Sequence, residues 1–304
     1  QTLAEKILED GDAFLRRINV MPVNEIKGEK IMPSLSKPVT ARTAITPSTE
    51  RKAKQLLAMD ADPYELFMTE TDVAIGYATI DAWAKFPNLV DRYGQLIRKT
   101  IANERLMIGW NGTSTAATTD STANPLLQDV NIGWIKKIKD WNSGSQHTAG
   151  GAAASPTAIE LGDTKFPNLD SVVYAALDKL KEPFRSYNDL VVMVSRNLMS
   201  AAEGKYYNAH GNQPTEKKEI EANIIINTYG GLPALVPPFM PDGLVLVTSL
   251  DNLSIYWQSG SWRRMLRDYA PRNAYEDFNS RNEGYVVEQY EKCYLLSNVL
   301  IKAA

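Results

Sequence analysis

The most regular hydrophobic pattern in the chain lies between residues 88 and 109. Apolar side chains recur there every three or four positions and most charged side chains fall between them, as in an amphipathic helix. The apolar stripe consists of Leu89, Tyr93, Leu96, Ile97, Ile101 and Ile108. Pro87 stands at the entrance, where its missing N–H costs no hydrogen bond, and Gly109 and Gly112 follow the last apolar position. The pattern predicts a long helix over 88–109, with Arg105 off the stripe.

Shorter apolar patterns predict further helices and several strands. Helices are expected over 1–17, 135–141 and 196–202, and from Leu169 onward. Apolar or alternating runs predict extended segments at 18–23, 73–80, 190–194, 232–236, 244–248, 253–257, 285–287 and 294–301. Because these elements do not follow a strand–helix–strand rhythm, they indicate an α+β fold and argue against a doubly wound nucleotide-binding sheet.

Two long segments lack helical periodicity. In residues 22–82, prolines and small polar residues separate strand-like flanks. A segment of this length without its own core is either functional or disordered. Residues 143–163 are rich in Gly, Ala and Ser and predict a mobile surface loop or a boundary.

The charges in the first of these segments are sorted by sign. Residues 25–54 hold seven basic and three acidic side chains, a net charge of +4, whereas residues 55–81 hold six acidic side chains and no basic one. One interpretation is a solvated loop with randomly placed charges. The other is a two-limbed arm that lies on another subunit, with each limb facing a surface of opposite charge. Such ion pairs would fix the position of the arm on its neighbour more than they would strengthen binding. The second makes these residues candidate inter-subunit contacts: Lys27, Lys30, Lys37, Arg42, Arg51, Lys52, Lys54, Asp60, Asp62 and Glu65.

The overall composition narrows the class of protein. Of 304 residues, 44% are hydrophobic and 23% charged, the balance of a folded globular protein. A net charge of −3 offers no concentrated basic face for a nucleic-acid groove. A single cysteine cannot close an intrachain disulfide, which favours folding in a reducing cytosol. We also expect no membrane-spanning segment and no signal peptide, and interpret the missing initiator Met as processing or trimming.

Known catalytic motifs are absent from the sequence. It contains no nucleophile elbow, phosphate-binding loop or dinucleotide-binding glycine motif. Cys293 lies in strand-like sequence and is expected to be a buried structural thiol. His147 and His210 lie in polar loops without further ligands at metal-binding spacing. We therefore expect no enzyme, no cofactor and no metal, and interpret the six tryptophans as core or interface residues.

Seven short motifs follow one another from residue 110 onward, and none of them is a catalytic signature. They are Trp110-Asn111-Gly112, Asn124–Val130 with Gly133-Trp134, Asp189–Val192, Gly231–Ala234, Leu250–Tyr256, Arg263-Arg264 and Tyr285–Glu288. In this order they resemble the major capsid proteins of Peduovirus-type (P2-like) temperate tailed phages.

That resemblance implies a Hong Kong 97-type capsid fold, which is an α+β fold. Its parts would be an amino-terminal arm at 1–21, an extended loop with flanking strands at 22–82, a peripheral domain at 83–164 that includes the spine helix 88–109, an axial domain at about 165–250, and return strands shared between both domains at 251–304.

The resemblance also implies a structural role in the icosahedral head. Subunits would assemble into hexamers and pentamers and enclose double-stranded DNA without reading its sequence. The implied partners are other copies, a scaffolding segment and a maturation protease during assembly, and a portal at one vertex. The expected location is the virion capsid, assembled in the host cytoplasm. Two alternatives stay open: a non-catalytic binding or decoration protein of the virion, and a hydrolase that uses scattered carboxylates.

Overall fold

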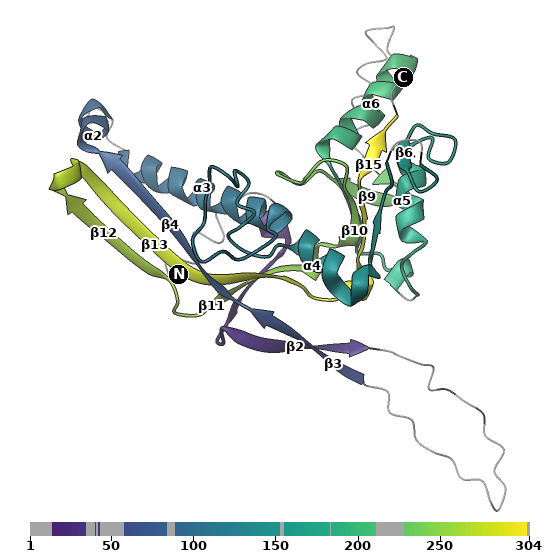
Figure 1. Cartoon of the computed structure of the whole chain (residues 1–304), viewed down its shortest axis with the longest axis horizontal. Helices are drawn as coiled ribbons and strands as arrows, with labels where there is room; N and C mark the ends of the chain where they lie inside the picture. The colour runs from purple at the N-terminus through teal and green to yellow at the C-terminus, as the bar shows by residue number, and fades with distance from the viewer. Residues whose placement is uncertain are drawn as a thin grey trace, which may run out of the picture.

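The computed structural model describes residues 14–34, 40, 42, 58–83, 89–152, 155–182, 184–210 and 228–302. Figure 1 shows an elongated molecule with two parts. In one part, long strands run beside a helix, and in the other a second sheet carries shorter helices. A thin two-stranded hairpin leaves the molecule near the junction of the two parts.

The first part is organised around β13 (Ala274–Val287), the longest described strand. Along one side of β13 run β11 (Leu253–Gln258) and then β12 (Arg263–Tyr269), both antiparallel to it. On the other side β4 (Phe67–Gly76) pairs with β13, also antiparallel. β1 (Asn19–Val23) adds a parallel pair to β11, so the described strands form a five-stranded sheet. We call the outer section of this sheet, made of β4, β13 and β12, the ribbon.

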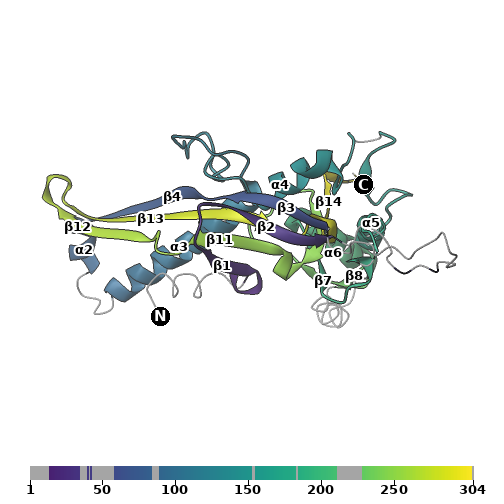
Figure 2. The same cartoon turned by 90° about the horizontal axis from the view of Figure 1, so that it is seen from below.

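Helix α3 (Leu89–Asn111) runs alongside the ribbon (Figures 1 and 2). Ile97 and Ile101 are buried against it, which confirms the helix predicted over 88–109. Two residues differ from the prediction: Leu96 is 63% exposed, whereas Arg105 is only 2% exposed. Arg105 is buried because the ribbon presents a carboxylate, Glu283, to this side of the helix.

The second part is a six-stranded sheet in the order β5, β14, β10, β7, β9, β8 among the described strands. Their bounds are β5 (His147–Ala149), β7 (Leu190–Val194), β8 (Thr228–Tyr229), β9 (Leu232–Leu235), β10 (Val245–Ser249) and β14 (Tyr294–Ser297). Two helices belong to this part, α5 (Leu169–Leu177) and α6 (Arg196–His210). A parallel pair, β6 (Ile159–Leu161) and β15 (Val299–Ile301), lies next to them.

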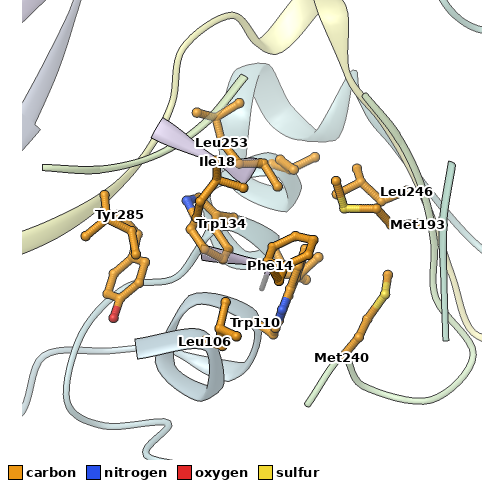
Figure 3. Packing of buried hydrophobic residues seen from close by; sticks show 14 of the residues in the cluster. Phe14, Ile18, Leu106, Trp110, Trp134, Met193, Met240, Leu246, Leu253 and Tyr285 are labelled. Atoms are coloured by element: carbon orange, nitrogen blue, oxygen red, sulfur yellow. The ribbon is translucent and has the colours of Figure 1, made fainter. Parts of the chain in front are cut away.

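The two parts share one hydrophobic core (Figure 3). Leu106 and Trp110 of α3 and Trp134 of α4 (Trp134–Asp140) meet Met193 of β7 and Leu246 of β10 there. The Trp110 and Trp134 rings lie 5.1 Å apart, edge to face. These two tryptophans are therefore core residues, as predicted.

The remaining described elements complete the connections. β2 (Lys27–Ser34) and β3 (Ala58–Glu65) form the hairpin, and α2 (Tyr77–Trp83) follows β4 directly. Short 3-10 turns lie at Leu15–Arg17, Trp141–Gly144, Phe184–Ser186, Leu250–Asn252, Ala270–Arg272 and Tyr290–Lys292.

Several local predictions were wrong. Residues 77–80 are helical rather than extended, and the helix expected over 196–202 continues to His210. The loop expected over 143–163 contains β5 and β6, because both strands find parallel partners near the end of the chain. The helix expected over 1–17 lies largely outside the described residues.

Candidate functional site

The hairpin carries some of the charge-sorted residues on two facing strands. β2 and β3 are antiparallel, with Lys27 opposite Glu65 and Lys30 opposite Asp62. The Lys27 and Glu65 charges lie 2.6 Å apart, and those of Lys30 and Asp62 2.8 Å apart. At the base of the hairpin the basic and acidic limbs therefore neutralise each other within one chain.

Two of the other candidate contacts fall within the described residues. Asp60 belongs to β3 and stands opposite Met32, and Arg42 is exposed. Lys37, Arg51, Lys52 and Lys54 lie outside the described residues. That these charged side chains contact another subunit stays a prediction.

Lys30 ties the hairpin to the body of the molecule. Its side chain is 9% exposed, and its ammonium group donates to the carbonyl oxygens of Val287 and Glu288, the latter at 3.1 Å. The same Nζ lies 4.8 Å from the centre of the Tyr290 ring, within cation–π range. Nothing in the sequence indicated this role, because the accepting carbonyls lie more than 250 residues away.

A second lysine shares this environment. Burial, together with the like charge of Lys30, lowers the pKa of Lys137 on α4 to about 8. Two ammonium groups and the carboxylate of Asp62 therefore meet where the hairpin leaves the body.

Aromatic packing fixes the direction of the hairpin at the same place. The rings of Tyr64 on β3 and Tyr256 on β11 meet edge to face, 5.1 Å apart. Gly28 lies under Tyr64 so closely that an added Cβ would come within 2.5 Å of the phenol oxygen. Leu66, just after β3, is 3% exposed, and its N–H donates to Ile26 at 2.8 Å. The base of the hairpin is therefore held by packing, by backbone hydrogen bonds and by Lys30.

Two arginines and one glutamate, here called the buried charge triad, join α3 to the ribbon. Glu283 of β13 is fully buried, and Arg105 and Arg281 are each 2% exposed. Arg105 Nη2 and Arg281 Nε both lie 2.8 Å from the same carboxylate oxygen of Glu283. Arg281 also donates to the hydroxyl of Thr71 on β4 at 3.3 Å. The triad thus connects three elements that are distant in sequence.

The triad keeps Glu283 ionised. Burial by itself would raise the pKa of this carboxyl, but Arg105 and Arg281 outweigh that effect and lower the pKa to about 2. The prediction placed Arg105 off the apolar stripe, but the sequence did contain a contrary signal: Arg105 follows Ile101 by four residues and so shares its face of α3. Nothing in the local pattern indicated Glu283 or Arg281.

The groups considered for catalysis have structural surroundings. Cys293 is fully buried, its thiol donates to the Tyr290 carbonyl, and burial raises its pKa to about 12, which confirms a structural thiol. His147 of β5 lies 2.7 Å from the Ser297 hydroxyl, and burial lowers its pKa. The side chain of His210 lies outside the described part of the structure.

Among the described residues no three His, Cys, Asp or Glu side chains gather as metal ligands. None of the described helices combines the length and apolar character needed to cross a bilayer.

The whole chain is similar to phage capsid proteins. The family model of "Phage major capsid protein, P2 family" matches residues 1–299. The chain is 32% identical over 308 residues to the "Capsid proteins" of Escherichia phage P2, covering 99% of this chain and 85% of the relative. It is 29% identical over 296 residues to the "Major capsid protein" of Serratia phage KSP20, covering 95% and 84%.

Solved structures show the same relationship at the level of the fold. A chain of the "Satellite phage P4 procapsid including size determination (Sid) protein" superposes with a TM-score of 0.84 at 30% identity, covering 99% of this chain and 91% of that chain. A chain of the capsid of an empty GTA particle superposes with a TM-score of 0.56 at 13% identity, covering 93% and 88%, and shows the fold alone. The predicted Hong Kong 97-type α+β fold and structural role in the virion capsid are thereby confirmed. With its sequence matched to residue 299 and its fold shared over nearly its whole length, the chain belongs to the P2 family of phage major capsid proteins.

Proposed function

We propose that this shell-forming subunit assembles through hexamers and pentamers, with the hairpin reaching onto a neighbouring copy. The observation that carries the proposal is the superposition on a procapsid chain at a TM-score of 0.84 over 99% of the residues. The hairpin supports it as well, because its two described strands project from the body of the molecule (Figure 1), where a neighbouring copy could contact them.

We infer a division of labour between the two parts of the molecule. In this proposal residues 1–21 are the arm, 22–82 the extended loop and 83–164 the peripheral domain with the spine helix. Residues 165–250 form the axial domain at capsomer centres, and 251–304 serve both domains. The strand pairing supports the shared assignment of 251–304, because β11, β12 and β13 belong to the sheet of the first part and β14 to the sheet of the second.

Weak, repeated contacts suit a shell subunit. Each copy needs several heterologous surfaces that close into rings and then into a sphere. A long hairpin can cover a neighbouring subunit without a second hydrophobic core. The entropy lost when it becomes ordered is offset only on assembly, so single contacts stay weak and wrongly placed subunits can dissociate. Many such contacts per subunit then make the finished shell hard to take apart.

The charge of the subunit suits a container for double-stranded DNA. A strongly basic inner wall would bind the packaged polyanion and hinder its entry and release. A net charge of −3 avoids that difficulty. This part of the proposal is wrong if an assembled shell has a strongly basic inner surface, as mapped by cryo-electron microscopy.

Assembly with accessory proteins completes the proposal. By analogy with the family, we propose a scaffolding segment, a maturation protease and a portal at one vertex as partners. The chain spans 85% and 84% of the two curated relatives, which leaves room in those proteins for a further segment.

Negative-stain imaging tests the proposed function. The chain is coexpressed with any amino-terminal extension present in its natural precursor and with the phage protease. Closed shells of uniform curvature, with clusters of six and five subunits, are expected. Small oligomers that never close would contradict the proposal and favour a binding or decoration protein of the virion.

A further inference from the structure

The ribbon has two edges on which, in the described part of the chain, no further strand pairs. One edge is β4 and the other is β12, with β13 between them. Free sheet edges invite pairing with another chain, and proteins control them with charged side chains. In this ribbon the charges on the two edges have opposite sign.

The pairing register places these charges on one face. Glu70 of β4 and Arg263 of β12 both stand opposite Ser280, and Asp72 and Met265 both stand opposite Phe278. Residues directly opposite one another in antiparallel strands share a face. Two neighbouring rows across the ribbon therefore begin with a carboxylate at the β4 edge, and the next row begins with Ala74 and ends with Arg267.

Two of the edge charges, Glu70 and Arg263, are not paired within the described part of the chain, whereas the carboxylate of Asp72 accepts from the Asn279 N–H at 3.3 Å. With strands about 4.8 Å apart, the backbones of Glu70 and Arg263 are separated by roughly 10 Å. Both side chains are exposed, and neither has an ion pair among the described residues. Arg267, two rows along on β12, shares the carboxylate of Glu276 with Arg272, so this edge keeps an excess of positive charge.

Exposed apolar side chains accompany the charges on this face. Met68 on β4 is 58% exposed and Met265 on β12 is 53% exposed. Methionine and arginine are both enriched where proteins contact one another, and exposed apolar groups beside charged ones mark such surfaces.

We propose that the β4 edge of one subunit docks against the β12 edge of a second copy, with Glu70 and Asp72 facing Arg263 and Arg267. This inference rests on the proposed shell function and names one of its contacts. Two β4 edges repel each other, as do two β12 edges, whereas unlike edges attract. The signs therefore select a head-to-tail contact, which is the kind that generates rings, over a two-fold contact between identical surfaces.

Charge reversals at this contact test the proposal. Glu70→Lys and Arg263→Glu are made singly and together in the full chain, and assembled shells are quantified by sedimentation and negative-stain imaging at low salt. Each single reversal is expected to raise the subunit concentration needed for half-maximal assembly by about threefold to tenfold, since one weak pair recurs at every contact. The double reversal restores an attractive pair and is expected to recover assembly.

The matched control combines Glu70→Lys with Lys179→Glu. Lys179 is exposed just after α5. This variant therefore has the same net charge as Glu70→Lys with Arg263→Glu, but it does not restore opposite charges on the two edges. Rescue by Arg263→Glu but not by Lys179→Glu supports the edge contact. Equal rescue by both, or single reversals that assemble normally, would overturn it while leaving the shell function intact. Failure of the unmodified chain to form shells would instead contradict the proposed function itself.

Discussion

At the scale of single residues, the attachment of the spine helix to the ribbon depends on Glu283. This carboxylate is fully buried and accepts from Arg105 at 2.9 Å and from Arg281 at 2.8 Å. Burying three charges is costly, and only their mutual attraction and hydrogen bonds offset that cost. Removing one partner therefore affects stability far more than an exposed ion pair would.

Glu283→Gln is expected to lower the free energy of unfolding by about 3–5 kcal/mol, because it leaves two buried guanidinium groups without a compensating charge. Urea unfolding of the unassembled subunit measures the change. Glu70→Gln, at an exposed carboxylate, serves as the control and is expected to change stability by less than about 0.5 kcal/mol. Equal effects of the two substitutions would contradict the role assigned to the triad.

The same group makes stability depend on acid pH. The pKa of Glu283 is about 2 in the folded state and about 4.5 as the reference value. A lowered folded pKa contributes stability that is fully present above the unfolded value and is lost as the pH falls through the folded value. The stability advantage of the unmodified chain over Glu283→Gln should therefore shrink between pH 4.5 and 2. An advantage that stays constant through this range in urea titrations would contradict the pKa assignment.

The apolar stripe of α3 supports a second stability prediction. Ile101 is 1% exposed, and Ile101→Asp places a charge in the contact with the ribbon, so the subunit is expected not to fold. Leu96→Asp is the matched control, because Leu96 on the same helix is 63% exposed. Circular dichroism and solubility distinguish the two variants. A soluble Ile101→Asp subunit with normal helix content would mean that this face of α3 is misassigned.

At the scale of elements, the hairpin of β2 and β3 projects from the body of the molecule (Figure 1). Lys30 joins it to the end of β13, and Tyr64 and Gly28 pack at its base. Beyond these contacts, Figure 1 shows the two strands leaving the body without a covering layer. The direction of the hairpin thus depends on a few side chains.

Lys30→Met is expected to leave the subunit folded but loosen the hairpin. Loss of a buried ammonium group that donates to two carbonyls should cost about 1–3 kcal/mol. Hydrogen exchange should become faster in β2 and β3, and shell assembly should decrease. Lys27→Met is the control, since the Lys27 side chain is 73% exposed and its ion pair is worth little. Unchanged exchange in Lys30→Met would show that packing alone holds the hairpin.

Elements differed in how well the sequence predicted them, and burial explains the difference. Helix α3 and β7 have apolar residues at regular spacing, and both were predicted close to their observed bounds. β12 and the first half of β13 were missed because their sequences are mostly polar and charged. Their backbones pair as an antiparallel ladder, and ion pairs such as Arg264–Asp277, at 2.6 Å, add side-chain contacts that an apolar pattern does not predict.

At the scale of the whole molecule, the shared core determines how the two parts are oriented. Trp134 packs against Gly109 of α3, where an added Cβ would collide with its ring. Gly133 lies against the backbone of the same helix and donates to Gly112 at 3.1 Å. Two of the motifs that suggested the family, at 110–112 and 133–134, therefore mark the packing of α3 against α4.

Reversing the basic limb of the extended loop tests assembly at the same scale. Arg51→Glu, Lys52→Glu and Lys54→Glu together are expected to leave a soluble, folded subunit that assembles poorly, because the limb would repel a surface it normally attracts. The charge-conserving triple variant Arg51→Lys, Lys52→Arg and Lys54→Arg is the control. Negative-stain counts of closed shells provide the measurement, and normal shells from the reversed variant would contradict the electrostatic role.

The sequence by itself determined the α+β class, the spine helix, the main apolar strands and, through seven ordered motifs, the family. These features depend on local periodicity or on short segments that can be compared directly. Only the tertiary structure revealed the Lys30 anchor, the buried charge triad and the oppositely charged edges of the ribbon. Each of these joins residues far apart in the chain, and polar side chains become structural only when folding removes them from water beside a specific partner.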